Sequence, residues 1–209
     1  MKVIILKQGV HVDLEFDSKT VSSRCKEICS SVVLLKAESP EEKNIIVDTG
    51  NLGYEDEILA NLEKQGVKPE DINYVINTHS HFDHITNNYL FKNADRVIGA
   101  TVWYTDKGQI GYNDLDLIKV PGIKMIKTPG HAATHTSVVV ENQGKTHVIA
   151  GDAIQEERIK KGLQKSNKIY MDSAKKILDM ADVIIPGHGR IIEGEDLEQL
   201  KKAVNQQEV

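Results

Sequence analysis

Three histidines and one aspartate occur within six positions of the sequence: His79, His81, Asp83 and His84. Neutral imidazole nitrogens and carboxylate oxygens are the ligands that Zn²⁺ and similar borderline metals prefer. These residues follow an apolar run, Ile72–Asn77, which we expect to be a buried strand. In an extended chain His84 would point away from the other three side chains, so a loop that turns here is required. The spacing therefore predicts a metal-binding loop, which can divide its ligands between two neighbouring ions.

Three more candidate ligands follow later predicted strands, and a glycine precedes each of them: His131, Asp152 and His188. Glycine lets the backbone turn sharply and approach other groups closely where a strand ends. A single histidine in such a place is more often an ordinary turn residue. Three strand ends with the same arrangement, in a chain that already contains the histidine-rich loop, favour one shared site.

The elements that must position these residues follow a repeated order. Short β-rich runs open the chain, and we expect Val3–Leu6 and Val10–Phe16 to form a hairpin around Gly9. A helix is predicted over Tyr54–Gln65, where apolar residues recur with helical spacing. The second half again places strands before helices and closes with a helix over Asp196–Val204. Two strand-rich halves with helices predict an α/β fold in which two sheets pack together and helices cover the outside.

Length and composition limit the class of protein. The 209 residues are expected to form one domain over residues 1–209, and 40% hydrophobic with 27% charged residues is typical of soluble proteins. The net charge of −5 disfavours binding to nucleic acid or to a membrane surface. The sequence contains neither an apolar run of about 18 residues nor a signal-peptide core. With only Cys25 and Cys29 present, we expect a cytoplasmic protein with reduced cysteines.

The order of the candidate ligands resembles the metallo-β-lactamase superfamily, from the strand end at Asp48-Thr49-Gly50 to Pro186-Gly187-His188-Gly189. The resemblance implies an αββα sandwich of two mixed sheets with helices on the outer faces. It also implies a site for two metal ions and a carboxylate outside the ligand set, that of Asp48, which orients a ligand imidazole. The family pattern assigns one metal to His79, His81 and His131, the other to Asp83, His84 and His188, and the bridging position to Asp152.

Within the superfamily, the ligands look most like those of the glyoxalase II, lactonase and phosphodiesterase groups. The segments around His131 and His188 also resemble the compact metallo-β-lactamase domain-containing protein 1 group. The 21 residues after His188 (209 − 188) leave no room for the larger glutathione-binding region of glyoxalase II. The tyrosine that lactonases carry shortly after the bridging aspartate is absent, and Tyr170 is the nearest one downstream. The sequence leaves open which of four side chains line the pocket: Tyr170, His135, Trp103 and Tyr104.

The resemblance implies a hydrolytic mechanism. Two divalent ions would bring a charge of +4, and the carboxylates of Asp83 and Asp152 would bring −2. The site would stay positively charged, so water between the ions would be acidified to hydroxide. The hydroxide would attack an ester, thioester, lactone or phosphodiester of a small-molecule substrate, with Asp83 orienting it or moving its proton. Zn²⁺ is the expected metal, although Fe and Mn suit the same ligands.

Two alternatives remain at this point. A persulfide dioxygenase would hold a single iron with His79, His131 and Asp152. A small metal-dependent nuclease is disfavoured by the charge of −5. The natural substrate and the oligomeric state, including a homodimer, are not determined by the sequence.

Overall fold

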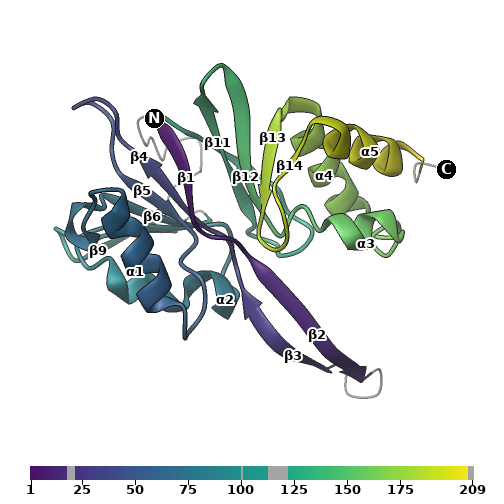
Figure 1. Ribbon diagram of the computed structural model, residues 1–209, viewed down its shortest axis with the longest axis horizontal. Coiled ribbons are helices and arrows are strands. Elements are labelled where there is room, and N and C mark those ends of the chain that lie inside the picture. Colours follow the sequence, from purple (N-terminus) through teal and green to yellow (C-terminus); the bar gives the residue numbers. More distant parts are fainter. Residues whose placement is uncertain (18–21, 100, 113–121, 207–209) are drawn as a thin grey trace.

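The computed structural model describes residues 1–17, 22–99, 101–112 and 122–206. They form two sheets and one separate two-stranded hairpin (Figure 1). The first sheet has seven strands in the order β1 (Lys2–Lys7), β4 (Val32–Lys36), β5 (Ile45–Val47), β6 (Tyr74–Asn77), β7 (Asp95–Ile98), β8 (Thr101–Tyr104) and β9 (Gln109–Tyr112). The second has five, in the order β10 (Lys124–Lys127), β11 (Thr136–Asn142), β12 (Lys145–Gly151), β13 (Val183–Pro186) and β14 (Ile192–Glu193).

The helices cover the outer faces of the two sheets (Figure 1). On the first sheet this is α1 (Glu55–Lys64), followed by the 3₁₀ turn η1 (Pro69–Asp71). On the second sheet it is α3 (Glu156–Lys160), α4 (Lys168–Met180) and α5 (Gly194–Asn205). Two short helices, α2 (Phe82–Ile85) and η2 (Thr86–Leu90), follow β6. None of the described helices is both long and apolar enough to cross a lipid bilayer.

Alternation along the strands explains why the sheets stack. Val33 of β4 and Ile149 of β12 are buried in one core between the two sheets. Their neighbours Leu34 and Val148 point to the opposite faces, where Leu34 packs with α1 and Val148 packs with α4 and α5. Because successive side chains of a strand face opposite ways, both sheets are apolar on both faces and need a helix layer outside. The predicted αββα sandwich is confirmed.

The expected hairpin between Val3–Leu6 and Val10–Phe16 is wrong. β1 pairs antiparallel with β4, whereas β2 (Val10–Asp17) pairs antiparallel with β3 (Ser22–Cys29) and projects from the sandwich (Figure 1). A Cβ atom on Gly9 would lie 1.9 Å from the carbonyl oxygen of Gly187. Gly9 is therefore a point of close backbone approach, and the chain passes through it into the hairpin instead of turning back.

The parallel strand pairs place the candidate ligands. β5 and β6 run parallel in the first sheet, as β12 and β13 do in the second. Parallel strands end at the same edge of their sheet. Asp48 follows β5 and the histidine-rich loop follows β6, while Asp152 follows β12 and His188 lies just beyond β13. These four strand ends therefore bring the candidate ligands of both sheets together.

Candidate metal centre

All seven candidate ligands converge at the strand ends. Their ligand atoms form three overlapping groups, and within each group the atoms lie within 4.8 Å of one another. The groups are His79, His81 and His131; Asp83, His84 and His188; and His79, His84 and Asp152. The first two groups match the two sets that the family resemblance implies. The third group joins them through Asp152.

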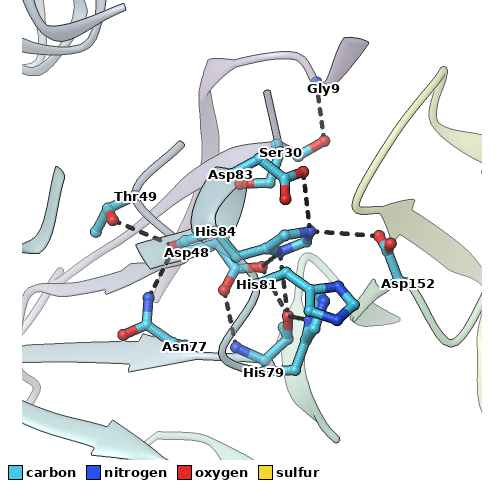
Figure 2. Close-up of polar contacts among 12 residues, drawn as sticks. Gly9, Ser30, Asp48, Thr49, Asn77, His79, His81, Asp83, His84 and Asp152 are labelled. Atoms are coloured by element: carbon cyan, nitrogen blue, oxygen red, sulfur yellow. Dashed lines mark hydrogen bonds and ion pairs between the residues drawn. The ribbon is translucent and has the colours of Figure 1, made fainter. Parts of the chain in front are cut away.

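Asp152 lies between the two sets and presents one oxygen to each. Its Oδ2 is 3.2 Å from Nε2 of His131, and its Oδ1 is 3.4 Å from Nε2 of His84 and 3.5 Å from Nε2 of His188. Figure 2 shows Asp152 facing His84 across the site. Oδ2 of Asp83 faces the same nitrogen of His84, Nε2, at 3.6 Å, and lies 3.1 Å from Nε2 of His188. A carboxylate in the position of Asp152 is suited to bridge two cations.

Four of the ligand atoms are buried and make no hydrogen bond among the described residues, although three of them lie 3.1–3.6 Å from other candidate ligands: His79 Nε2, Asp83 Oδ2, His84 Nε2 and Asp152 Oδ1. Buried polar atoms are nearly always satisfied, and leaving one without a partner costs about 1–3 kcal/mol. Here such atoms gather in one place, and all are nitrogen or carboxylate oxygen. The donor set fits divalent cations, which would satisfy all of these atoms at once.

A single helical turn allows all four candidate ligands of the histidine-rich loop to face one site. His81 has extended backbone angles, and α2 begins at the next residue. The turn is closed by the backbone N–H of His84, which donates to the carbonyl of His81 at 3.0 Å. Asp83 and His84 are buried, whereas Phe82 is exposed. The helix therefore turns both of these ligands inward, which an extended chain could not do.

Asp48 orients the loop from beneath. Its Oδ1 accepts from the backbone N–H of Thr78, and its Oδ2 accepts from the hydroxyl of Thr78 and from Nδ1 of His84, each at 2.8 Å (Figure 2). Because the Thr78 hydroxyl donates to Asp48, it can only accept from Nδ1 of His79, 3.1 Å away. Both imidazoles therefore carry their proton on Nδ1 and turn Nε2 toward the site. Asp48 thus orients a candidate ligand imidazole from outside the ligand set, as the family resemblance implies.

His188 is held by the opposite end of the chain. Its Nδ1 donates to the carbonyl of Val10 at 3.1 Å. Ser31 binds the loop that carries His188. Its hydroxyl donates to the carbonyl of Pro186, and its N–H donates to the carbonyl of Gly187, both at 2.7 Å. The ring of His11 lies 5.3 Å from that of His188. No sequence pattern predicted this attachment, because Gly9 and Val10 had the pattern of an ordinary hairpin.

The buried environment sets the charge of the ligands. Burial lowers the pKa of His79 to about 2 and also lowers that of His131, so both are neutral and able to bind a cation. Burial alone would raise the pKa of Asp152, but the facing His84 and His188 lower it well below its usual range. For Asp83, burial is likewise outweighed by His188 and His84, and its pKa is lowered. Both carboxylates are therefore ionised.

His135, one of the four residues that the sequence left open, lies behind the site and is almost fully buried. Its Nε2 accepts the backbone N–H of Asp152 at 3.2 Å. Its Nδ1 donates to the hydroxyl of Thr128 at 3.0 Å, which donates to Ser137, whose hydroxyl donates to the carbonyl of Ala150. Burial lowers the pKa of His135 to about 3, so the ring is neutral. His135 therefore binds the backbone of a candidate ligand, Asp152, and is not itself one of the clustered ligands.

Tyr170 is also a packing residue. It is buried under the His131 loop, and a Cβ on Gly130 would come 2.4 Å from its Cα. Its hydroxyl accepts the backbone N–H of Gln155 at 2.9 Å. Gln155 was not expected from the sequence, yet its Nε2 donates to Oδ2 of Asp152 at 3.2 Å. No motif pointed to it, because a lone glutamine carries no recognisable pattern.

The two aromatic residues on β8 differ in environment. Tyr104 packs against the core between the sheets, and Lys107 lies over its ring. Trp103 is half-buried and lies opposite Arg96 and Ile110 in the sheet. An open cleft of about 350 Å³ lies beside the site, and its lining is Ile28, Asn51, Ser80, His81, Phe82 and Asp83. Neither Trp103 nor Tyr104 lines this cleft.

Comparison with known proteins agrees with this geometry. Residues 27–112 match the family model of the metallo-beta-lactamase superfamily. The chain is 34% identical to metallo-beta-lactamase domain-containing protein 1 of Xenopus laevis over 192 residues, which cover 87% of this chain and 79% of the relative. It is 35% identical to a probable metallo-hydrolase of Methanocaldococcus jannaschii over 162 residues, 73% of this chain and 74% of the relative.

The fold is also found among solved structures. A probable metal-dependent hydrolase from Staphylococcus aureus aligns with a TM-score of 0.61 and 20% identity, covering 90% of this chain and 88% of that one. The chain therefore belongs to the metallo-β-lactamase superfamily. Within it, the chain is a member of a metallo-hydrolase family, and its clustered histidines and aspartates fit metal binding.

Proposed function

We propose that the protein is a dinuclear metal-dependent hydrolase, with Zn²⁺ as the metal in both positions. The observation that carries the proposal is the set of four buried ligand atoms that make no hydrogen bond, at the meeting point of the seven side chains. One cation would be held by His79, His81 and His131, and the other by Asp83, His84 and His188. Asp152 would bridge them, since its two oxygens face the two sets.

Two divalent cations supply Lewis acidity, which makes water available as hydroxide near neutral pH and polarises a substrate oxygen. The chain's own residues supply position and proton transfer. Asp83 is ionised, and it lies both among the ligands and on the open cleft beside His81, where it can orient a water molecule and accept its proton. Asp48 and Thr78 fix the imidazoles that surround this position. The substrate class is an ester, thioester, lactone or phosphodiester.

Two features favour this reading over a site with one iron. An ion held by His79, His131 and Asp152 alone would leave Oδ2 of Asp83 and Nε2 of His84 buried, 3.6 Å apart and without a hydrogen bond. It would also leave unused the support that Asp48 gives to His84. A second cation accounts for both observations.

The test is the metal content and the reaction of protein purified without added metal. Elemental analysis should find two equivalents of zinc or manganese per chain, and a panel of thioesters, lactones, β-lactams and phosphodiesters should show hydrolysis that a chelator abolishes. His188→Ala should bind one equivalent less, whereas His147→Ala, a histidine on β12 outside the cluster, should bind the full amount. One equivalent of iron together with oxygen uptake on a persulfide would overturn the proposal.

A further inference from the structure

The chain leaves α3 through a turn that exposes a leucine side chain. Gly162 has a φ of 69°, and its N–H donates to the carbonyl of Ile159 at 2.9 Å. The N–H of Leu163 donates to the carbonyl of Arg158 at the same distance. These bonds define a Schellman motif, in which a residue at the position of Leu163 usually packs on an apolar side chain at the position of Arg158 or Glu157. Both of those residues are charged and exposed, and Leu163 is itself 61% exposed.

A second aliphatic side chain is exposed where α4 begins. Ile169 lies in the first turn of that helix, outside the face that packs on the second sheet, and it is 60% exposed. The chain between Leu163 and Ile169 is compact, because two hydrogen-bonded turns lie within it. The bonds run from the N–H of Lys165 to the carbonyl of Gly162 and from the N–H of Asn167 to that of Gln164. Residues 156–169, which we call the α3–α4 segment, thus carry two exposed aliphatic side chains in one compact stretch.

The α3–α4 segment is also cationic. It has five cationic side chains and two carboxylates, a local charge of +3 in a chain whose net charge is −5. All five cationic residues are exposed: Arg158, Lys160, Lys161, Lys165 and Lys168. Ion pairs between exposed side chains, such as Lys161 with Glu157 at 3.4 Å, contribute little and leave both groups open to other charges. Charges more than about 8 Å apart are largely screened at physiological salt, so the local charge decides what this surface attracts. The net charge, which disfavours a membrane surface for the chain as a whole, does not.

Hydrogen bonds fix the α3–α4 segment to the loops of two candidate ligands. Nε2 of Gln164 donates to Oε1 of Gln155 at 3.3 Å, and Gln155 in turn binds the candidate bridging carboxylate. Nδ2 of Asn167 donates to the carbonyl of Gly130, the residue before His131, at 3.1 Å. Figure 1 shows α3 and the turn that follows it at the rim of the molecule. A partner that binds here would meet a preformed surface next to the metal centre.

The chemistry of the segment favours a lipid surface over other anionic partners. Lysines around exposed aliphatic side chains are typical of surfaces that lie in the headgroup region of a bilayer. There the aliphatic groups leave water, while the long lysine stems keep their ammonium groups at the lipid phosphates. Surfaces that bind single-stranded nucleic acid add aromatic side chains on which bases stack, and residues 156–169 include no aromatic residue. The centres of protein interfaces are depleted of Lys and enriched in Tyr and Trp.

We propose that the α3–α4 segment docks the protein on anionic lipid bilayers. Leu163 and Ile169 enter the headgroup region, and the surrounding lysines contact the lipid phosphates. The inference goes beyond the proposed hydrolase function and does not depend on a bound metal. The docked protein holds the loops of His131 and Asp152 near the lipid surface.

The first experiment measures binding of the full chain to vesicles by flotation. The partition coefficient should be at least about tenfold higher for mixed phosphatidylcholine and phosphatidylglycerol vesicles than for phosphatidylcholine alone, and it should fall as salt is raised. Leu163→Asn combined with Ile169→Asn should lower binding to the mixed vesicles at least about tenfold, because both side chains lose the gain from leaving water. Ile110→Asn changes a similarly exposed aliphatic side chain on β9 and should leave binding unchanged.

The second experiment tests the lysines. Lys161→Gln combined with Lys165→Gln should lower binding to the mixed vesicles at least about fivefold. The matched control is Lys64→Gln combined with Lys92→Gln, which removes two charges from exposed lysines outside the segment and should have no effect. All of these substitutions are at exposed positions, and circular dichroism checks that each variant is folded.

The outcomes separate docking from catalysis. Vesicle binding that persists after treatment with a chelator would support docking, whether or not the protein proves to be a hydrolase. Equal binding to the two kinds of vesicle, or unchanged binding in both double variants of the segment, would overturn the proposal. A labelled single-stranded oligonucleotide is titrated into the same proteins. Oligonucleotide binding that the lysine variant loses, without binding to vesicles, would assign the segment to nucleic acid instead.

Discussion

The backbone N–H of Asp152 donates to Nε2 of His135 at 3.2 Å, and this bond joins a candidate bridging ligand to three strands. From Nδ1 of His135 the hydrogen bonds continue through Thr128, which follows β10, and Ser137 of β11 to the carbonyl of Ala150 in β12. Each N–H or O–H group in this series donates to one acceptor. Nε2 of His135 must accept and Nδ1 must donate, so only a neutral ring with its proton on Nδ1 fits the arrangement. The backbone of Asp152 is thus held by residues of the sheet, while its side chain is held by Gln155 of its own loop.

Replacing His135 should weaken metal binding. His135→Ala leaves the buried N–H of Asp152 without an acceptor, which costs about 1–3 kcal/mol. Loss of an outer-shell partner typically lowers metal affinity by about 10–100-fold, and we expect a loss of that size. His135→Gln offers an amide oxygen near the position of Nε2 and should recover part of it. Metal affinity is measured by competition with a chromophoric chelator, and an unchanged affinity in His135→Ala would contradict the role.

Asp48→Asn should reduce both activity and metal affinity by about 10–100-fold. The carboxylate accepts three hydrogen bonds from Thr78 and His84, and an amide cannot accept all three or support the imidazole with a full negative charge. Asp182→Asn is the matched control, because Asp182 also accepts a backbone N–H, that of Thr146, outside the site. Equal effects of the two substitutions would show that Asp48 contributes only to stability.

His81→Ala should abolish hydrolysis and remove the cation held by His79, His81 and His131. Metal content should fall from two equivalents to one, because the second set of ligands does not include His81. His147→Ala provides the control, since His147 lies on β12 outside the cluster and its Nδ1 donates to the carbonyl of Lys145. Elemental analysis and the rate with the best substrate of the panel check the result. Retention of metal and rate in His81→Ala would remove this residue from the centre.

Cys29 should make folding stability depend on pH in the alkaline range. Its thiol is free and fully buried, and burial raises its pKa to about 11. The folded chain therefore keeps this proton at a pH where the unfolded chain, with a thiol pKa of about 8.5, has lost it. The stabilisation is complete below about pH 8.5 and is lost as pH rises toward 11, with a change of about 2–3 kcal/mol.

Urea denaturation of wild type and Cys29→Ala at about pH 7 and pH 10.5 isolates this contribution, because the other alkaline titrations occur in both proteins. The difference in free energy of unfolding between the two proteins should shrink at the higher pH. A difference that is independent of pH would show that the thiol titrates normally in the folded state.

The clustering of the candidate ligands and the sandwich could be predicted because local sequence patterns indicate both. The histidine-rich loop follows an apolar run, and strands such as β4 are apolar on both faces. The strand β3 was missed because Ser22–Cys29 is largely polar and pairs only with its neighbour β2. Gly9 was misread because its contact, Gly187, is distant in sequence and invisible to any local pattern.

The roles of individual histidines were harder to predict than their presence in the site. His131 and His135 are four residues apart and chemically identical, yet one faces the cluster and the other turns to the backbone of Asp152. That difference is set by Thr128 and Ser137, which are not part of any ligand motif. Hydrogen bonds that cross three strands decide the orientation of the ring.

The bond between His188 and the carbonyl of Val10 has a consequence for biosynthesis. The histidine-rich loop is translated early, whereas His188 and the loop that Ser31 binds are synthesised late. In a nascent chain the carbonyl of Val10 and the hydroxyl of Ser31 therefore lack these partners until residue 188 has left the ribosome. The group of candidate ligands that includes His188 can be complete only after the segment around Val10 has met the loop that follows β13.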